Sequence, residues 1–159
     1  MLATFGGHGS HLPLAEAAAN DSFALVATDY EVGEHALTHP NLRVIHATDF
    51  ERAGLAYTDL LAASDVVVTK LGYGIVSECI ANQVALLYAC RGRFVEQDVF
   101  IREMPGVIRS RHITQEDLRA GRWAESIDAL LAQPAPTRIM RVDGADVVAE
   151  RLLSLERPG

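Results

Sequence analysis

Two glycine-rich segments, each directly after a short apolar run, hold residue types that could bind a phosphorylated ligand. The first is Gly6-Gly7-His8-Gly9-Ser10, after residues 2–5, and the second is Gly72-Tyr73-Gly74-Ile75, after residues 65–69. Glycine lets a ligand approach the backbone, and a helix that follows presents free N–H groups and the positive end of its dipole. The two segments therefore predict a site for an anionic group such as a diphosphate.

Charged and hydroxyl side chains surround the second segment. Lys70 precedes it, and Ser77 and Glu78 follow it in the first turn of the next expected helix. A carboxylate can accept hydrogen bonds from two neighbouring hydroxyls, so Glu78 is a candidate for binding a ribose, although it could equally complement the helix dipole. Lys70 is the one lysine in the chain. It could neutralise a phosphate or remain a solvated surface charge.

Other reactive residue types give weaker patterns. His8 is a candidate for proton transfer because it lies in the first glycine segment, but no neighbouring carboxylate orients it. Arg91 and Arg93 could pair with a substrate phosphate or with the acidic residues that follow them. Ser77 lacks the motif of an acyl-transfer nucleophile. The histidines show no metal-ligand spacing, so no metal site is expected.

Composition limits the class of protein. The 159 residues suffice for one domain, 1–159, and the 49% hydrophobic and 22% charged residues are typical of a globular protein. The net charge is −7, and residues 1–65, with nine acids and two bases, account for all of it. We expect this acidity to lie away from the segment 70–78, which is compatible with an anionic ligand at the sheet edge.

Charge, hydropathy and cysteine spacing also bear on nucleic-acid binding, membrane insertion and cellular location. Acids interleave with the seven arginines between Arg91 and Arg122, so a nucleic-acid surface is not expected. No apolar run is long enough for a transmembrane segment, and nothing reads as a signal peptide. Cys79 and Cys90 lack the spacing of a metal or redox pair and are expected to be reduced thiols of a cytoplasmic protein.

Apolar runs alternate with amphipathic stretches, which is typical of a protein built from βαβ units. The predicted strands are 2–5, 23–27, 42–46, 65–69, 85–89 and 107–110. The predicted helices are 12–19, 54–63, 75–82, 94–104, 115–118, 122–132 and 144–155. Thr114, with Asp117 three residues on, and Asp143 mark helix starts, and Trp123 and Phe100 are expected in the core.

These elements predict an α/β fold, a Rossmann-like doubly wound parallel sheet of six strands with helices on both faces. The common strand order for such a sheet is 3-2-1-4-5-6, in which strands 1 and 4 are neighbours at the point where the chain reverses direction. Ligands bind outside the carboxyl ends of those two strands. Both glycine-rich segments would meet there.

The sequence resembles the C-terminal domain of GT-B glycosyltransferases, particularly the type found in the N-acetylglucosamine transferase of peptidoglycan synthesis. The resemblance covers nearly the whole chain. It is carried by Phe5-Gly6-Gly7, the strand from Ser64-Asp65 to Thr69-Lys70, the Gly72-x-Gly74-x-x-Ser77-Glu78 segment, Glu96-Gln97-Asp98 and Asp143-Gly144-Ala145. The stretch from Lys70 to Glu78 is also similar to glycosyltransferase-like domains attached to sugar kinases.

The resemblance implies a site for a nucleotide-sugar donor, usually a UDP-sugar, which is a substrate, and no cofactor. The segments 6–10 and 72–75 would hold the diphosphate, Glu78 the ribose, and Glu96 with Gln97 the sugar hydroxyls. The acceptor and the general base would come from an N-terminal acceptor domain, or a partner chain, that these residues do not include. Catalysis by the chain alone is therefore doubtful.

Two other functions remain open. Asp29 follows Gly9 by twenty positions at the end of the second predicted strand, where an acid binds the ribose of a dinucleotide such as NAD. Against an oxidoreductase domain, residues 6–11 do not fit the GxGxxG pattern. A non-catalytic module that binds a sugar nucleotide would need the same pocket as the transferase.

Overall fold

The computed structural model describes residues 1–5, 12–32, 38–90, 92 and 96–155. In this part of the chain, six strands form one sheet in which every pairing is parallel, in the order β3-β2-β1-β4-β5-β6. The strands are β1 (Leu2–Ala3), β2 (Leu25–Thr28), β3 (Leu42–Ile45), β4 (Val66–Lys70), β5 (Ala85–Ala89) and β6 (Ser110–His112). The predicted fold class and strand order are confirmed.

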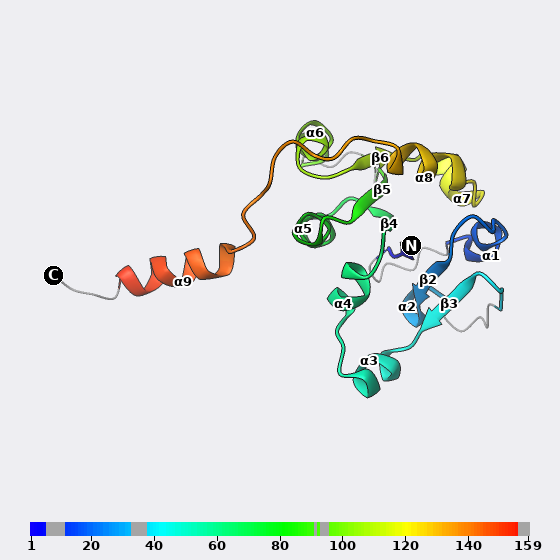
Figure 1. Ribbon diagram of the computed structural model, residues 1–159, viewed down its shortest axis with the longest axis horizontal. Coiled ribbons are helices and arrows are strands. Elements are labelled where there is room, and N and C mark those ends of the chain that lie inside the picture. Colours follow the sequence, from blue (N-terminus) through cyan, green and yellow to red (C-terminus); the bar gives the residue numbers. More distant parts are fainter. Residues whose placement is uncertain (6–11, 33–37, 91, 93–95, 156–159) are drawn as a thin grey trace.

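Helices connect the strands. They are α1 (Leu14–Ala18), α2 (Asp29–Val32), α3 (Ala47–Ala53), α4 (Tyr57–Ala62), α5 (Tyr73–Asn82), α6 (Gln97–Glu103), a 3₁₀ turn η1 (Met104–Gly106), α7 (Gln115–Arg119), α8 (Ala124–Leu131) and α9 (Gly144–Leu155). Figure 1 shows α1, α7 and α8 on one side of the strands and α4, α5 and α6 on the other. The last helix, α9, stands apart from this body at the end of an extended segment (Figure 1).

Successive residues of each strand point to opposite faces of the sheet, so the apolar runs supply two cores. Val66 and Val68 pack in the cluster under α1, α7 and α8, whereas Val67 packs in the cluster under α4, α5 and α6. Trp123 fills the first cluster with no exposed surface, as expected. Phe100 is only partly buried, against the second cluster. A strand that is buried on both faces explains why the sequence reads as continuous apolar residues.

The helix predicted over residues 54–63 begins later, at Tyr57, as α4, and a helix that was not predicted, α3, lies just before it. Gly54 has φ +65°, and its N–H and that of Leu55 bond to carbonyl oxygens of the last turn of α3, so Gly54 ends α3 and does not begin a helix. Asp49 and Asp59 each accept a hydrogen bond from the backbone N–H three residues earlier, at 3.0 and 2.7 Å, and these bonds fix the starts of α3 and α4.

The strand predicted over residues 107–110 begins later, at Ser110. The N–H groups of Val107 and Ile108 both donate to the Met104 carbonyl oxygen at 2.9 Å, which continues the 3₁₀ turn. These two side chains are buried even so, with 5% and 1% of their surface exposed. The apolar pattern thus predicted correctly that Val107 and Ile108 are buried, but it did not predict the hydrogen bonds that place them in a turn and not in a strand.

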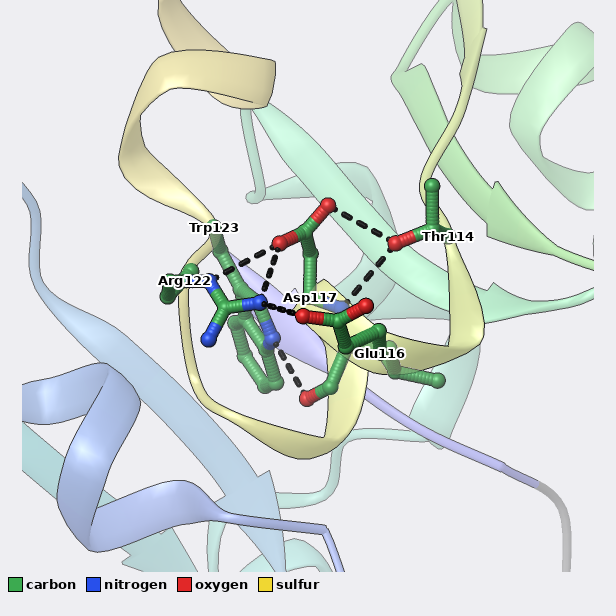
Figure 2. A network of polar contacts seen from close by, with 6 residues as sticks. Thr114, Glu116, Asp117, Arg122 and Trp123 are labelled. Atoms are coloured by element: carbon green, nitrogen blue, oxygen red, sulfur yellow. Dashed lines mark hydrogen bonds and ion pairs between the residues drawn. The ribbon is translucent and has the colours of Figure 1, made fainter.

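The turn between α7 and α8 is held by the polar network drawn in Figure 2. Thr114 Oγ1 accepts the Asp117 N–H at 3.0 Å, as the predicted helix start requires. Arg122 then pairs with both Asp117 and Glu116. The Trp123 indole N–H donates to the Leu118 carbonyl oxygen at 3.0 Å, so the buried ring leaves its polar atom satisfied.

No helix in the described ranges has the length and apolar character that crossing a bilayer requires.

The turn between α7 and α8 should depend on Gly121. Its φ is +69°, and a Cβ added there would lie 2.7 Å from Glu16 Cβ and 2.8 Å from the Ala17 backbone nitrogen of α1. Gly121→Ala should therefore lower the free energy of unfolding by about 2–5 kcal/mol, because backbone strain and overpacking add. Gly54→Ala is the matched control. It has a similar φ of +65° but open space around the Cβ, so a loss of about 1 kcal/mol is expected in urea denaturation. Equal losses for the two variants would contradict the packing argument.

Cys79 should make the stability depend on pH in alkaline solution. Burial in the second cluster is the main cause that raises the pKa of its thiol from 9.0 to about 12, and the Glu78 charge adds to it. Above pH 9 the unfolded chain loses this proton while the folded chain keeps it, so stability falls as pH rises. The stability difference between the wild-type protein and Cys79→Ala should shrink by about 1.4 kcal/mol between about pH 8 and pH 10. Urea denaturation in reducing buffer at each pH measures it, and a pH-independent difference would refute it.

Candidate functional site

A cavity of about 620 Å³ opens at the carboxyl ends of β1, β2 and β4. This is the edge of the sheet where the chain reverses direction, and the volume suits a small-molecule ligand. The lining residues come from four places in the chain: Thr4 and Phe5 after β1; Thr28, Asp29, Tyr30 and Glu31 after β2; Ala47, Phe50 and Tyr57 from α3 and α4; and Thr69, Lys70, Leu71, Gly72, Gly74, Ile75 and Glu78 from β4 and α5.

The side of the cavity formed by β4 and α5 contains five of the predicted site residues, Lys70, Gly72, Gly74, Ile75 and Glu78. Helix α5 begins directly after Gly72, and its first turn contains no acidic residue. A Cβ added at Gly72 or Gly74 would meet no atom within 4 Å. Packing therefore does not require glycine at either position, and the backbone is open to close approach.

Four other predicted residues do not line the cavity. Tyr73 is 61% exposed and packs edge-on against Phe100, with 4.9 Å between the ring centroids. Ser77 is exposed one turn later, because residues four apart share one face of a helix. Glu96 and Gln97 lie at the start of α6. The Gln97 Oε1 is buried and accepts no hydrogen bond from the described residues.

The remaining predicted residues are Gly6, Gly7, His8, Gly9, Ser10 and Arg93, which lie outside the described residues.

Glu31 is a cavity residue that the sequence analysis missed. It lies in the four-residue helix α2, and only 9% of it is exposed. Its Oε1 accepts the Phe5 N–H at 2.7 Å and the Thr4 hydroxyl at 3.1 Å. Residues that follow parallel strands meet at the carboxyl edge of the sheet. The sequence analysis used this rule for the first and fourth strands. The same rule, used for the second strand, points to Glu31.

Tyr57, at the start of α4, is a second missed residue. Burial is the main cause that raises its pKa, and the negative charges of Glu78 and Glu31 raise it further, while a hydrogen-bonding contact with the Thr4 side chain lowers it. The phenol is therefore neutral at physiological pH and can exchange hydrogen bonds with a ligand. Tyr57 lines the cavity from α4, within electrostatic reach of Glu31 on the β2 side and Glu78 on the α5 side.

Asp29, the residue of the dinucleotide hypothesis, lines the cavity directly after β2. Its Oδ2 accepts the Ala47 N–H at 3.1 Å and lies 3.6 Å from His46 Nδ1. The carboxylate thus holds the first residue of α3. This contact gives Asp29 a structural role that needs no ribose.

The charged side chains in the described lining are Asp29, Glu31, Glu78 and Lys70. The expectation that the acidity of residues 1–65 lies away from the site is therefore wrong for Asp29 and Glu31, which line the same cavity as Lys70. Carboxylates accept hydrogen bonds from hydroxyl groups, and an ammonium group and a helix start attract anions. The cavity can therefore hold a ligand that has both hydroxyl groups and an anionic part. Within the described ranges, no cluster of histidine, cysteine or acidic residues could hold a metal ion.

No protein-family profile matches the sequence. A curated relative is L-arabinokinase from Arabidopsis thaliana, which is 30% identical over 99 residues, 61% of this chain and 9% of that protein.

Two solved structures share the fold. The glycotransferase of kitacinnamycin superposes with a TM-score of 0.70 and 22% identity, over 99% of this chain and 42% of its own. The glycosyltransferase SnogD from Streptomyces nogalater superposes with a TM-score of 0.54 and 17% identity, over 97% of this chain and 41% of its own. The chain thus spans less than half the length of these solved relatives. It has the fold that the sequence resemblance predicts, that of the C-terminal domain of GT-B glycosyltransferases.

Proposed function

We propose that the chain, as a single domain, is the donor-binding part of a glycosyltransferase whose donor is a nucleotide sugar, with a UDP-sugar as the first candidate. The observation that carries the proposal is the cavity at the carboxyl ends of β1 and β4, with Lys70, Gly72, Gly74 and Glu78 in its lining. In this proposal the diphosphate lies against Lys70 and the start of α5, and Glu78 accepts hydrogen bonds from the ribose. The segment 6–10 would complete the diphosphate site, and Glu96 and Gln97 would bind the sugar.

The proposed chemistry needs no nucleophile from this chain. When a glycosyl group transfers with inversion, the acceptor attacks directly and the nucleoside diphosphate leaves. The role of Lys70 and the backbone N–H groups is to hold that leaving group and to stabilise the charge that develops on it. The acceptor and the general base belong to a second domain or a partner chain.

Helix α9 supports the existence of such a partner. None of its residues is buried, and five apolar side chains are 44–73% exposed: Val147, Val148, Leu152, Leu153 and Leu155. A helix with this much exposed apolar surface gains stability by packing on another surface. The solved relatives are more than twice as long as this chain. In our proposal the acceptor domain covers α9.

A non-catalytic sugar-nucleotide-binding module is the second candidate. The similarity to L-arabinokinase favours this candidate. The matching segment is 9% of that protein, and that protein is named as a kinase and not as a glycosyltransferase. The module would bind the same ligands and would not transfer the sugar when the partner domain is supplied.

A calorimetric screen of UDP, GDP, their sugar conjugates and NAD identifies the ligand class. Binding of NAD alone would reject both candidates in favour of an oxidoreductase domain.

Glu78→Ala should weaken binding of the nucleoside diphosphate by about 1–3 kcal/mol, because a charged acceptor of ribose hydrogen bonds is lost. Calorimetry with UDP or GDP measures the change, and Glu125→Ala, at an exposed glutamate in the first turn of α8, is the matched control. Wild-type affinity in the folded Glu78→Ala variant would remove Glu78 from the ligand site. A helix-dipole role does not apply to Glu78, because it lies beyond the first turn of α5.

Gly74→Val should block the ligand and leave the fold intact, because no atom lies within 4 Å of an added Cβ. Normal ligand binding by the folded variant would remove Gly74 from the site.

The apolar stripe of α9 should be dispensable for the stability of this chain. Val148, Leu152 and Leu155 share one face of the helix, and Val148 and Leu152 are 58% and 60% exposed. The double variant Val148→Glu, Leu152→Glu should change the free energy of unfolding by less than about 0.5 kcal/mol and reduce binding of an apolar dye. Arg151→Glu is a control for the added charge. A loss above about 1 kcal/mol would show that α9 packs on its own chain.

A further inference from the structure

The segment between α8 and α9, residues 134–143, crosses the outside of the domain without a helix or strand of its own. Figure 1 shows it running past α6 before it reaches α9. The residues from Thr137 to Val142 are all exposed, and Ile139 is 94% exposed. A segment with so little buried surface is expected to move freely unless polar contacts hold it.

Arg138 supplies such contacts. Its backbone N–H donates to the Gly106 carbonyl oxygen at 2.9 Å, and its Nη2 donates to the Glu103 carbonyl oxygen at 3.1 Å. The same nitrogen lies 3.4 Å from Oε2 of the Glu103 carboxylate. Glu103 is the last residue of α6, where carbonyl groups lack partners within the helix. In the described part of the chain, every hydrogen bond and ion pair that joins residues 134–155 to the rest of the domain comes from Arg138.

Gly106 lies in η1 with a backbone that does not call for glycine. Its φ is outside the left-handed region, in contrast to Gly54, Gly92 and Gly121. A Cβ added at Gly106 would lie 2.6 Å from Arg138 Nη2 and 2.8 Å from Arg138 Nε. Glycine at this position therefore provides the space that the guanidinium occupies. An alanine there would displace the end of a flexible side chain and leave the backbone of η1 in place.

Gln133 holds the chain before Arg138. Its Oε1 accepts the Ser110 N–H at 3.2 Å, and its Nε2 donates to the Ser110 carbonyl oxygen at 3.0 Å. Five residues, 139–143, separate Arg138 from the start of α9, whereas ten, 134–143, separate Gln133 from it. At about 3.5 Å per residue, α9 can start at most about 20 Å from Arg138 but up to about 40 Å from Gln133. The contacts of Arg138 thus halve the distance over which α9 can move.

We propose that Arg138, Gly106 and Glu103 form a clasp that sets the reach of α9. When the clasp is closed, the free segment begins after Arg138, and when it is open, the free segment begins after Gln133. Exposed ion pairs contribute little to stability, so the clasp can open while the domain stays folded. A short tether raises the effective concentration of α9 for a partner surface near α6. The clasp residues do not belong to the described cavity lining, so the test needs no ligand.

Trypsin reports whether the clasp is closed, because it cleaves after arginine and must take that side chain into its own pocket. Arg141 is the control in the same segment, since it pairs with Asp143 two residues further on. Cleavage of the folded wild-type chain after Arg138 should be at least about tenfold slower than after Arg141, as measured by mass spectrometry of the first products. Gly106→Ala keeps Arg138 but displaces it, and the two rates should then agree within about threefold. Equal rates in the wild-type chain, or an unchanged ratio in Gly106→Ala, overturn the inference.

Spin labels measure the reach of α9. Glu125→Cys in α8 and Glu150→Cys in α9 place the labels at exposed positions, with Cys90→Ser to remove a partly accessible thiol. In this background, Arg138→Ala and Gly106→Ala should each broaden the distribution of distances between the two labels. The double variant should be no broader than either single variant, because both substitutions open the same clasp.

Arg141→Ala is the matched control for the loss of an exposed arginine, and it should leave the distance distribution unchanged. A wild-type distribution as broad as that of Arg138→Ala, or an equal broadening in Arg141→Ala, overturns the inference. If Gly106→Ala lowers the melting temperature by more than about 5 °C, its fold is disturbed and the comparison of Arg138→Ala with Arg141→Ala decides. None of these outcomes bears on the donor site, so the proposed function stands or falls separately.

Discussion

The parallel pairing of β1 with β4 is the constraint on which the rest of this structure depends. Leu2 lies beside Val67 and Ala3 beside Val68, so two segments distant in the chain end at the same edge of the sheet. β1 leads to β2 through α1 on one face of the sheet, β4 leads to β5 through α5 on the other face (Figure 1), and the cavity opens at the edge between the two strands. The cavity is a consequence of this topology before any side chain is considered.

Register then decides which residues reach the cavity. β4 pairs with β5 from Val66 beside Ala85 to Lys70 beside Ala89, and its side chains alternate between the two cores. A shift of one residue would move Val67 into the wrong core and Lys70 to the other face. Burial of the apolar side chains on both faces therefore fixes where β4 ends and where α5 begins. The position of Gly72 at the edge is a result of core packing as much as of local sequence.

The sequence predicted the sheet order and the β4–α5 side of the cavity because both depend on patterns within short segments. Lys70 ends β4 and Glu78 lies in α5, and the strand, the glycine segment and the helix that hold them are recognisable in the sequence. Glu31 and Tyr57 could not be found in that way, because their importance arises from neighbours in space. Glu31, in α2, contacts Thr4, which follows β1, and Tyr57 lies at the start of a helix whose sequence says nothing of the cavity beside it. The αL conformation of Gly54, which separates α3 from α4, follows from backbone hydrogen bonds that an apolar pattern does not report.

The distribution of charge around the cavity favours one orientation for an anionic ligand. Asp29 and Glu31 stand on the β2 side, where their carboxylates already accept backbone N–H groups. Lys70 and the start of α5 stand on the β4 side. An anionic group is repelled from the first side and attracted to the second, and in the poorly solvated interior of a cavity the difference between two such positions is larger than in water. The acidic residues of the first part of the chain thus need not oppose a diphosphate. They would confine it to the side where the helix dipole and the ammonium group can stabilise it, with Glu78, one turn further along α5, left to accept hydrogen bonds from hydroxyl groups.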